Sequence, residues 1–484
     1  MALRYICLSD LHLGAADSLL THIDGMDQSS PALPSQSLVL FAEALRATAK
    51  RLSDGTLPTL VLLGDVMDLG LSPAGVTAKA FLRFLDVLFP EDGERLFQPD
   101  IVCVPGNHDY SIWSQAQETA FMASVECDGA ETVADDLAQF TPMFGAPQLV
   151  SPLMTRLLQT RKGLEQASVR IAYPNLGLQD AGGKRIAVIH HGHNIDAMYR
   201  ALSRFKSFLS DTPDPPMTVA ELAENGPWID FLWSDLGSAG DAGKGAGALY
   251  EIMLDAGASH YLAGEIADRL LDKLEKGFGL LPNKILARGV TVSELVRGLI
   301  DLTIGKAAES QRNGYSTVLA TDELADLRWY LSGPVATQMR DERINEVPDQ
   351  IAFIFGHTHK PFQDQLSVPG FTLPVAIYNT GGWVLDQPTL MPCQGASAIL
   401  LDDALDIAAL RLFNDPVNGV MAGVHVEGIG GWLDQQNPFL LAVTVAAASE
   451  AERWDLFSDA VEHAIDKRAK MRMAELYTWQ DAAE

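Results

Sequence analysis

The chain has 484 residues, of which 47% are hydrophobic and 20% are charged, and its formal net charge is −28. A prior of roughly 100–200 residues per domain predicts two or more structural units, or one large domain with insertions. The hydrophobic content argues against a disordered chain. The negative charge argues against sequence-independent binding of duplex DNA, because such binding depends on many lysine and arginine contacts to phosphates.

No run of about 18 uninterrupted apolar residues occurs, so we expect no membrane-spanning helix. The four cysteines lie at positions 7, 103, 127 and 393 and form neither a C-x-x-C pair nor a zinc ribbon. The sequence enters a strand pattern directly at its start, so we expect no signal peptide. These features predict a protein of the reducing cytoplasm.

Five short apolar runs, each followed by a polar cluster, organise the chain. They span residues 5–8, 60–63, 101–104, 186–189 and 351–355. Such runs are typical of strands buried on both faces. Apolar positions at helical spacing predict helices over 38–51 and 78–88. Strand–helix–strand order indicates an α/β fold, in which ligands gather at the carboxyl ends of the strands.

Further elements follow the same logic. Residues 169–178 and 184–190 are predicted to form a β-hairpin, because two glycines lie between them. Two more strands are predicted over 396–401 and 408–413, and a helix over 450–479.

The region between the fourth and fifth apolar runs interrupts this scheme. Amphipathic pieces over 228–233, 248–254, 266–274 and 292–302 predict short helices, with a flexible glycine-rich loop over 237–247. We therefore divide the chain into a core over 1–194 and 349–415, an inserted helical subdomain over 195–348, and a mostly helical extension over 416–484. The insertion is expected to form a lid that sets substrate choice, or else the interface of a homo-oligomer.

The first two polar clusters carry carboxylates. Asp10 and His12 are two residues apart, so in an extended segment both side chains would point to the same side and could hold one ion. Asp65 follows a strand and Gly64, and its two oxygens could bridge two cations. Taken alone, each cluster also fits an ordinary turn.

The other three clusters are richer in histidine. Gly106, Asn107, His108 and Asp109 follow the third strand; the Asn107 amide oxygen suits a cation, and His108 could donate a proton or stabilise negative charge. The fourth cluster holds three histidines in four residues, which would be costly in an ordinary core because each needs hydrogen-bond partners. The fifth pairs two more histidines. These two clusters contribute His190, His191, His193, His357 and His359.

The order of the five motifs resembles the calcineurin-like metallophosphoesterases. The resemblance covers residues 4–109, 184–194 and 351–383, and it implies a four-layer αββα sandwich with a dinuclear metal site at the carboxyl ends of the strands. One ion would be held by Asp10, His12, Asp65 and His359. The second would be held by Asp65, Asn107, His191 and His357. His191 is chosen from the fourth motif because the ligand in this family usually precedes a glycine.

The resemblance also implies a reaction. Two divalent transition-metal ions, with manganese expected and iron or zinc as alternatives, would activate a bridging hydroxide that attacks a phosphate ester. His108 would protonate the leaving oxygen or stabilise charge, with Asp68 or Asp109 orienting its ring. His193 and His190 are candidates for substrate binding, although adjacent strand residues point to opposite faces and His190 should face away from His191.

The substrate stays open at this point. A phosphodiesterase or phosphatase acting on a small or lipid-linked phosphoester is favoured. The motif order also resembles the UDP-diacylglucosamine pyrophosphatases, but His108 stands where that family usually has arginine. It resembles double-strand-break repair nucleases as well, although the acidic surface makes nucleic acid an unfavourable partner. A catalytically inactive scaffold of the same fold is the alternative of another class.

Overall fold

A computed structural model gives the structure of the chain. It describes residues 2–24, 28–29, 32–128, 137–196, 199–200, 203, 214–223, 226, 271, 281–284, 291, 293, 319, 321–342, 348, 350–385, 390–414, 423–429 and 437–483. The short helices and the glycine-rich loop predicted between residues 228 and 302 lie outside the described residues.

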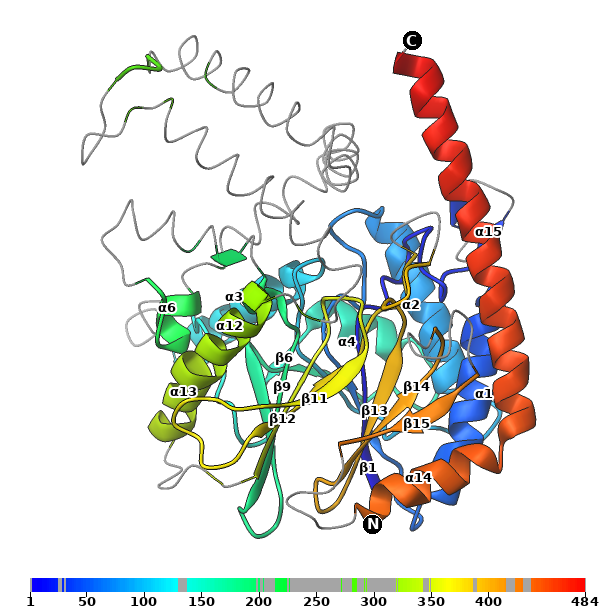
Figure 1. Ribbon diagram of the computed structural model, residues 1–484, viewed down its shortest axis with the longest axis horizontal. Helices are drawn as coiled ribbons and strands as arrows, with labels where there is room; N and C mark the ends of the chain where they lie inside the picture. Colours follow the sequence, from blue (N-terminus) through cyan, green and yellow to red (C-terminus); the bar gives the residue numbers. More distant parts are fainter. Residues whose placement is uncertain are drawn as a thin grey trace.

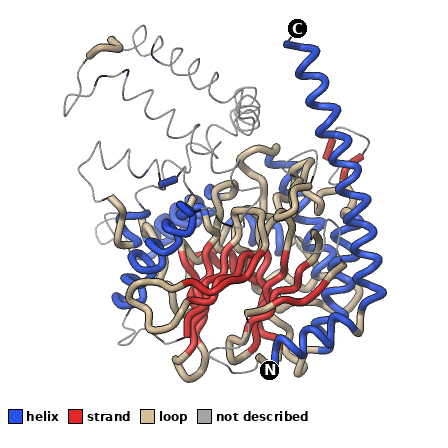
Figure 2. The backbone as a smooth tube through the Cα atoms, viewed as in Figure 1, coloured by secondary structure: helices blue, strands red, loops and turns tan. Residues whose placement is uncertain are grey.

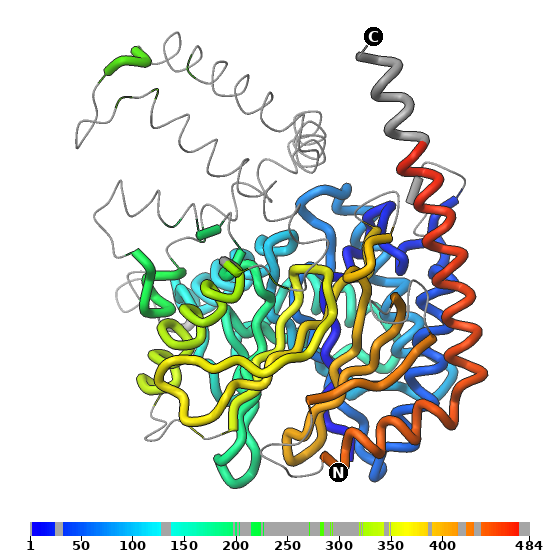
Figure 3. The backbone as a smooth tube through the Cα atoms, in the orientation of Figure 1, coloured from blue at the N-terminus to red at the C-terminus, as the bar shows by residue number. Residues whose placement is uncertain are grey.

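The larger sheet has eight strands in the order β15-β14-β13-β1-β4-β5-β7-β6. Its four central strands run parallel: β1 (Leu3–Leu8), β4 (Thr59–Leu62), β5 (Ile101–Cys103) and β7 (Val169–Ile171). Antiparallel strands extend both edges: β6 (Leu149–Val150), β13 (Ser397–Asp402), β14 (Ile407–Arg411) and β15 (His425–Glu427). Figure 3 shows the N-terminal strand lying beside strands from the last fifth of the chain.

The smaller sheet has five strands in the order β11-β12-β10-β9-β8. The three central strands are parallel and the two edge strands are antiparallel. The strands are β8 (Asn175–Gln179), β9 (Arg185–His190), β10 (Gln350–Phe355), β11 (Phe362–Leu366) and β12 (Val375–Asn379). A separate two-stranded ribbon joins β2 (Ile23–Asp24) to β3 (Gln28–Ser29). The α/β class is therefore confirmed, with two mixed sheets.

An apolar core fills the space between the two sheets, which appear in red in Figure 2. The larger sheet contributes Cys7 and Val61 to it, Leu63 follows directly after β4, and the smaller sheet contributes residues such as Ile189 and Ile354. All five side chains are fully buried. Because the strands face this core on one side and helices on the other, they read as continuous apolar runs.

Helices cover the outer face of the larger sheet (Figure 1). They are α1 (Gln36–Arg51), α2 (Ala74–Leu88), α3 (Tyr110–Asp128), α4 (Pro152–Gln159), α14 (Pro438–Ala448) and α15 (Ala451–Ala483). The Ser35 hydroxyl caps α1 by accepting from Leu38 N at 3.1 Å. The indole of Trp454 on α15 donates to Thr48 on α1 at 3.1 Å, which ties the C-terminal helix to the fold.

A second group of helices covers the outer face of the smaller sheet. It comprises the short helix α6 (Val219–Ala223) and the continuous run of α12 (Thr321–Tyr330), the π-helical turn η5 (Leu331–Val335) and α13 (Ala336–Asp341). Leu327, Tyr330 and Met339 of this run pack against Val188 and Phe353 of the sheet. This run falls within the range predicted as an insertion, and it covers the sheet that carries the fourth and fifth motifs.

The predicted hairpin is only partly correct. Strands β8 and β9 pair antiparallel as expected, but residues 169–178 do not form one strand. The first part of this range forms β7 in the larger sheet, and the last part belongs to β8 in the smaller sheet. Pro174 lies between them, and a proline has no backbone N–H to donate to a sheet. The chain therefore crosses from one sheet to the other at this point.

Among the helices that the structure describes, none is both long and apolar enough to cross a membrane.

Candidate metal centre

The five motifs meet at one edge of the two sheets. They directly follow β1, β4, β5, β9 and β10, which are the parallel strands whose carboxyl ends point the same way. The loops after β1 and β4 continue the pairing of their strands, because Asp10 N donates to Gly64 O at 3.0 Å and His12 N donates to Asp65 O at 2.9 Å. Sheet topology thus explains why residues so far apart in sequence converge.

The backbone at these motifs differs from the extended form expected from sequence. Five residues have φ between 43° and 69°: Asp10, His12, Asp65, His357 and His359. In the described residues, only Leu405 and Asn414 among the other non-glycine residues share this left-handed conformation. Strands β1 and β10 end before their motifs, so the two-residue spacing places these side chains through turns and not through strand alternation. Each such conformation costs about 1–3 kcal/mol and persists only where the surroundings enforce it.

Glycines in the motifs allow the loops to approach each other closely. A Cβ added to Gly106 would collide with Asp65, and one added to Gly356 would collide with Asp10 and Ser9. These two glycines therefore let the third and fifth motifs pack directly against the carboxylates of the second and first.

The first group of candidate ligands consists of Asp10, His12 and His359, whose donor atoms all lie within 4.8 Å of one another. The Asp10 carboxylate accepts the backbone N–H of His357 at 2.9 and 3.1 Å and also the hydroxyl of Ser9. His359 Nε2 lies 3.5 Å from Asp10 Oδ1. Asp10 is fully buried, so its orientation is held by backbone and hydroxyl donors.

The second group consists of Asp65, His191 and His357. His191 Nδ1 donates to the carbonyl of Leu63 at 2.7 Å, which leaves Nε2 for a ligand. That Nε2 atom lies 3.3 Å from Asp65 Oδ2 and 3.1 Å from the Asn107 amide oxygen. The predicted ligand Asn107 is thus placed within this group.

Asp65 lies between the two groups. The same Oδ2 atom that contacts His191 lies 3.8 Å from His12 Nε2, while Oδ1 accepts the backbone N–H of His108 at 2.8 Å. Within the described part of the chain, the ion pairs of Asp10 and Asp65 are all with histidines. Buried carboxylates and imidazoles without thiolates or lysines are a donor set that fits two divalent cations.

A third group joins His12, Asp68 and His108. His108 Nδ1 lies 3.0 Å from Asp68 Oδ1, and His12 Nδ1 lies 3.6 Å from the same oxygen. Of the two carboxylates predicted to orient His108, the structure places Asp68 against its ring. Asp109 instead accepts backbone N–H groups of Gly106 at 2.7 Å and Val66 at 2.9 Å. Asp109 therefore joins the loops of the second and third motifs.

The charges of these groups are strongly coupled. Burial alone would lower the pKa of His12, but its contact with Asp68 and the charges of Asp65 and Asp68 raise that pKa to about 9. Burial would also lower the pKa of His191, but the charge of Asp65 and the contact with its carboxylate raise that pKa to about 9. Burial would raise the pKa of Asp65, but the charges of His191 and His108 hold it well below its usual range. Without cations, protons on the histidines balance the carboxylates.

The other two histidines of the fourth motif have different surroundings. His190 is fully buried, its ring lies 4.7 Å from that of Tyr330, and its Nε2 accepts from the Asn194 amide at 3.0 Å. Burial lowers its pKa well below the usual value. The role of His190 in substrate binding stays a prediction, and its ring lies beside those of Tyr330 and Phe353. His193 is also fully buried, with its ring 6.3 Å from that of Tyr173 and stacked on it.

Two side chains near the ligands were not singled out from the sequence. Asp196 Oδ2 lies 3.4 Å from His357 Nε2. The hydroxyl of Ser9 contacts both Asp10 and Thr380. The only sequence signal for Asp196 is a carboxylate shortly after the His-Gly-His motif.

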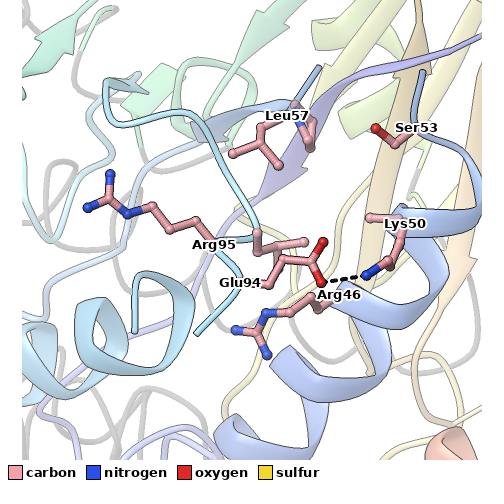
Figure 4. A pocket seen from close by; sticks show the side chains of 9 residues that line it. Arg46, Lys50, Ser53, Leu57, Glu94 and Arg95 are labelled. Atoms are coloured by element: carbon pink, nitrogen blue, oxygen red, sulfur yellow. Dashed lines mark hydrogen bonds and ion pairs between the residues drawn. The ribbon is translucent and has the colours of Figure 1, made fainter. Parts of the chain in front are cut away.

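One surface pocket lies elsewhere. It is lined by the end of α1 and by the residues before β4 and β5, which is the opposite end of the strands from the ligands (Figure 4). Lys50 Nζ lies 2.7 Å from Glu94, and the Arg95 guanidinium donates to the carbonyl of Gly163 at 3.0 Å. These basic side chains of the pocket therefore already have partners, and the pocket is separate from the candidate metal centre.

Comparisons with known proteins agree with this geometry. The family model described as calcineurin-like phosphoesterase matches residues 3–273, which is more than half of the chain and includes the first four motifs. No curated protein matches the sequence. The fifth motif lies beyond the matched residues, and the fold brings it to the same site through β10. The chain therefore belongs to the calcineurin-like phosphoesterase family, and it is a metallophosphoesterase.

Proposed function

We propose that this metallophosphoesterase hydrolyses a phosphodiester or phosphomonoester of a small or lipid-linked substrate at a dinuclear centre. The first ion would be held by Asp10, His12, Asp65 and His359, and the second by Asp65, Asn107, His191 and His357. The observation that carries this proposal is the position of Asp65, because its Oδ2 atom lies near His12 of the first group and His191 of the second.

The residues of the chain divide the work between them. When bound, two divalent ions would neutralise the charge of a phosphoryl group and supply a nucleophile at neutral pH. His108 is held through Nδ1 by Asp68, so a proton given to the leaving oxygen would come from Nε2. Its backbone N–H is fixed on Asp65, which places it at the edge of the pair of sites. His12 also contacts Asp68, so one carboxylate links the predicted acid to a predicted ligand.

The nature of the ions follows from the donors. Oxygen and imidazole ligands without thiolate suit manganese, with iron and zinc as alternatives. Cys7 and Cys103 are buried within strands β1 and β5, where they pack as small apolar residues. The order of helices, two sheets and helices supports the four-layer sandwich that the family resemblance implies.

A substrate panel tests the proposal. Protein stripped of metal would be reloaded with Mn²⁺ and assayed on a nitrophenyl monoester, a nitrophenyl diester, nucleotides, single-stranded DNA and a nucleotide-linked lipid. We expect Mn²⁺-dependent release of phosphate or alcohol from at least one small or lipid-linked ester. Asp364→Asn removes an exposed carboxylate on β11 and should behave as the parent protein.

The other outcomes identify the alternatives. Preferential cleavage of DNA would replace the proposal by a nuclease, against the expectation from a net charge of −28. Two bound ions without turnover of any substrate would indicate an inactive scaffold.

A further inference from the structure

The segment that follows β9 places a carboxylate beside a predicted ligand. His357 Nε2 lies 3.4 Å from Asp196 Oδ2, and the Asp196 side chain is 32% exposed. An imidazole has two nitrogens, so if Nε2 faces Asp196 then Nδ1 is the one available to an ion. We propose, resting on the dinuclear site above, that Asp196 is a positioning residue that holds His357 with Nδ1 presented to the second ion.

Local backbone geometry brings Asp196 to this place. Gly192 has φ of 128°, and the 3-10 turn η1 (His193–Ile195) follows it directly. Asp196 N donates to His193 O at 3.1 Å, which closes the turn. A Cβ at Gly192 would come within 2.8 Å of the His357 Cβ, so the bare glycine lets the two loops pack together. The turn therefore returns the chain to the fifth motif immediately after it has supplied His191.

A buried arginine anchors the same turn to the helix layer. Arg200 N donates to Asp196 O at 3.0 Å. The Arg200 guanidinium donates through Nε to Asp326 at 3.1 Å and lies 3.9 Å above the Trp329 ring. Arg200 as a whole is only 6% exposed, and both partners belong to α12. The backbone of Asp196 is thus anchored to α12 through Arg200. This anchoring distinguishes Asp196 from a surface carboxylate on a mobile segment.

The chemistry of metal-bound histidine gives this contact its role. A carboxylate that accepts from the nitrogen not bound to the ion fixes the tautomer and the ring orientation. Loss of such a partner typically costs about 10–100-fold in metal affinity. The effect should fall on the second ion, because His357 is one of the predicted ligands of that ion and not of the first.

The first experiment needs no metal. Protein labelled with ¹⁵N-histidine is stripped of metal, and the ring nitrogens of His357 are identified by comparison with His357→Gln. We expect His357 in the parent protein to carry its proton on Nε2, and Asp196→Ala to lose that preference. An unchanged pattern of ring nitrogen shifts in Asp196→Ala would overturn the proposal.

The second experiment measures the two ions separately. Calorimetric titration with Mn²⁺ should show the second ion bound about 10–100-fold more weakly in Asp196→Asn and Asp196→Ala, with the first ion bound as in the parent protein. Asp196→Glu should restore part of the affinity, and Arg200→Leu should weaken the second ion by a smaller factor. Asp364→Asn serves as the matched control for the loss of one negative charge.

The outcomes separate this inference from the proposed function. A parent protein that binds no Mn²⁺ would remove the dinuclear proposal. Parent-like affinity for both ions in Asp196→Ala would overturn only the role of Asp196. An Asp196 carboxylate bound to the ion in a Mn²⁺-loaded crystal structure would also overturn it, because Asp196 would then be a ligand.

Discussion

The two predicted ion sites are supported by different parts of the molecule. Asp10 in the first site is fully buried, and its oxygens accept from the His357 backbone and the Ser9 hydroxyl. In the second site, His191 is held by the carbonyl of Leu63, directly after β4, but His357 faces the partly exposed Asp196. The first site thus depends on the two sheets and their immediate loops. The second also depends on the segment after β9, which α12 anchors.

The two ions should therefore not be equivalent. A ligand held by buried donors, as Asp10 is, is oriented before the ion arrives, whereas a ligand held by a partly exposed carboxylate, as His357 is, is ordered in part by binding. We therefore expect the first ion to bind more tightly than the second.

We expect the greatest loss when the carboxylate that the two sites share is removed. Asp65→Ala deletes the carboxylate that faces both histidine groups, so both ions should bind poorly and turnover should fall by more than about 10⁴-fold, because the clamp on the phosphoryl group is lost. Metal content by mass spectrometry and rates on the best substrate of the panel measure this. Retained metal together with retained turnover would contradict the bridging assignment.

The next substitution leaves both ion sites intact. His108→Ala should lower the rate by about 10²–10⁴-fold, as removal of a general acid does, without changing metal content. The loss should be larger for an alkyl ester than for a nitrophenyl ester, whose leaving group needs no proton. Asp68→Asn should give a smaller loss with the same preference, because Asp68 only contacts the His108 ring.

The outcomes for His108 distinguish two roles. Equal losses on both esters would indicate stabilisation of charge in place of proton donation. A lost ion would show that His108 is a ligand.

A third change tests the inequality of the sites directly. His359→Ala should weaken the first ion and His357→Ala the second, and each variant should keep the other ion. Because only His357 is held by the partly exposed Asp196, His359→Ala should retain measurable binding of the first ion where His357→Ala loses the second. Stepwise Mn²⁺ titration checks this order. Simultaneous loss of both ions in either variant would show that the sites form one cooperative unit.

The smallest effect concerns pH. The folded-state pKa values of His12 and His191, each about 9, lie above the ordinary value of 6.5. Their contribution to the stability of metal-free protein is therefore fully present below pH 6.5 and is lost as pH rises through 9. Each tenfold rise in proton affinity on folding corresponds to about 1.4 kcal/mol. Bound cations would replace these protons, so the stabilisation by Mn²⁺ should grow between pH 6.5 and 9.

Thermal unfolding with and without Mn²⁺ across this pH range measures the difference. His12→Gln and His191→Gln should each reduce the pH dependence of the metal-free protein. His190→Gln should not, because the pKa of His190 is lowered and the ring is neutral throughout. Equal pH dependence in all three variants would contradict the coupling to the carboxylates.

Much of the fold could be anticipated because the strands are short apolar runs with distinctive ends. The runs at 5–8, 60–63 and 351–355 correspond to β1, β4 and β10. The run at 169–178 misled, because apolar character does not reveal which sheet a strand joins. The position of α12 on the smaller sheet could not be predicted from the sequence either, because local periodicity does not indicate which sheet a helix covers.

The amino-acid pattern alone indicates which side chains could take part in chemistry, because Asp, Asn and His recur after strands in an order that chance does not produce. How these side chains are used depends on contacts that form only in the folded chain. Neighbouring residues His190 and His191 have the same side chain, yet one ring lies against Tyr330 and the other against Asp65. The left-handed backbone of Asp10 and His359 and the contact of Asp196 with His357 are likewise set by loops packed from distant parts of the chain. A ligand's geometry depends on what surrounds it, and those surroundings exist only once the two sheets have come together.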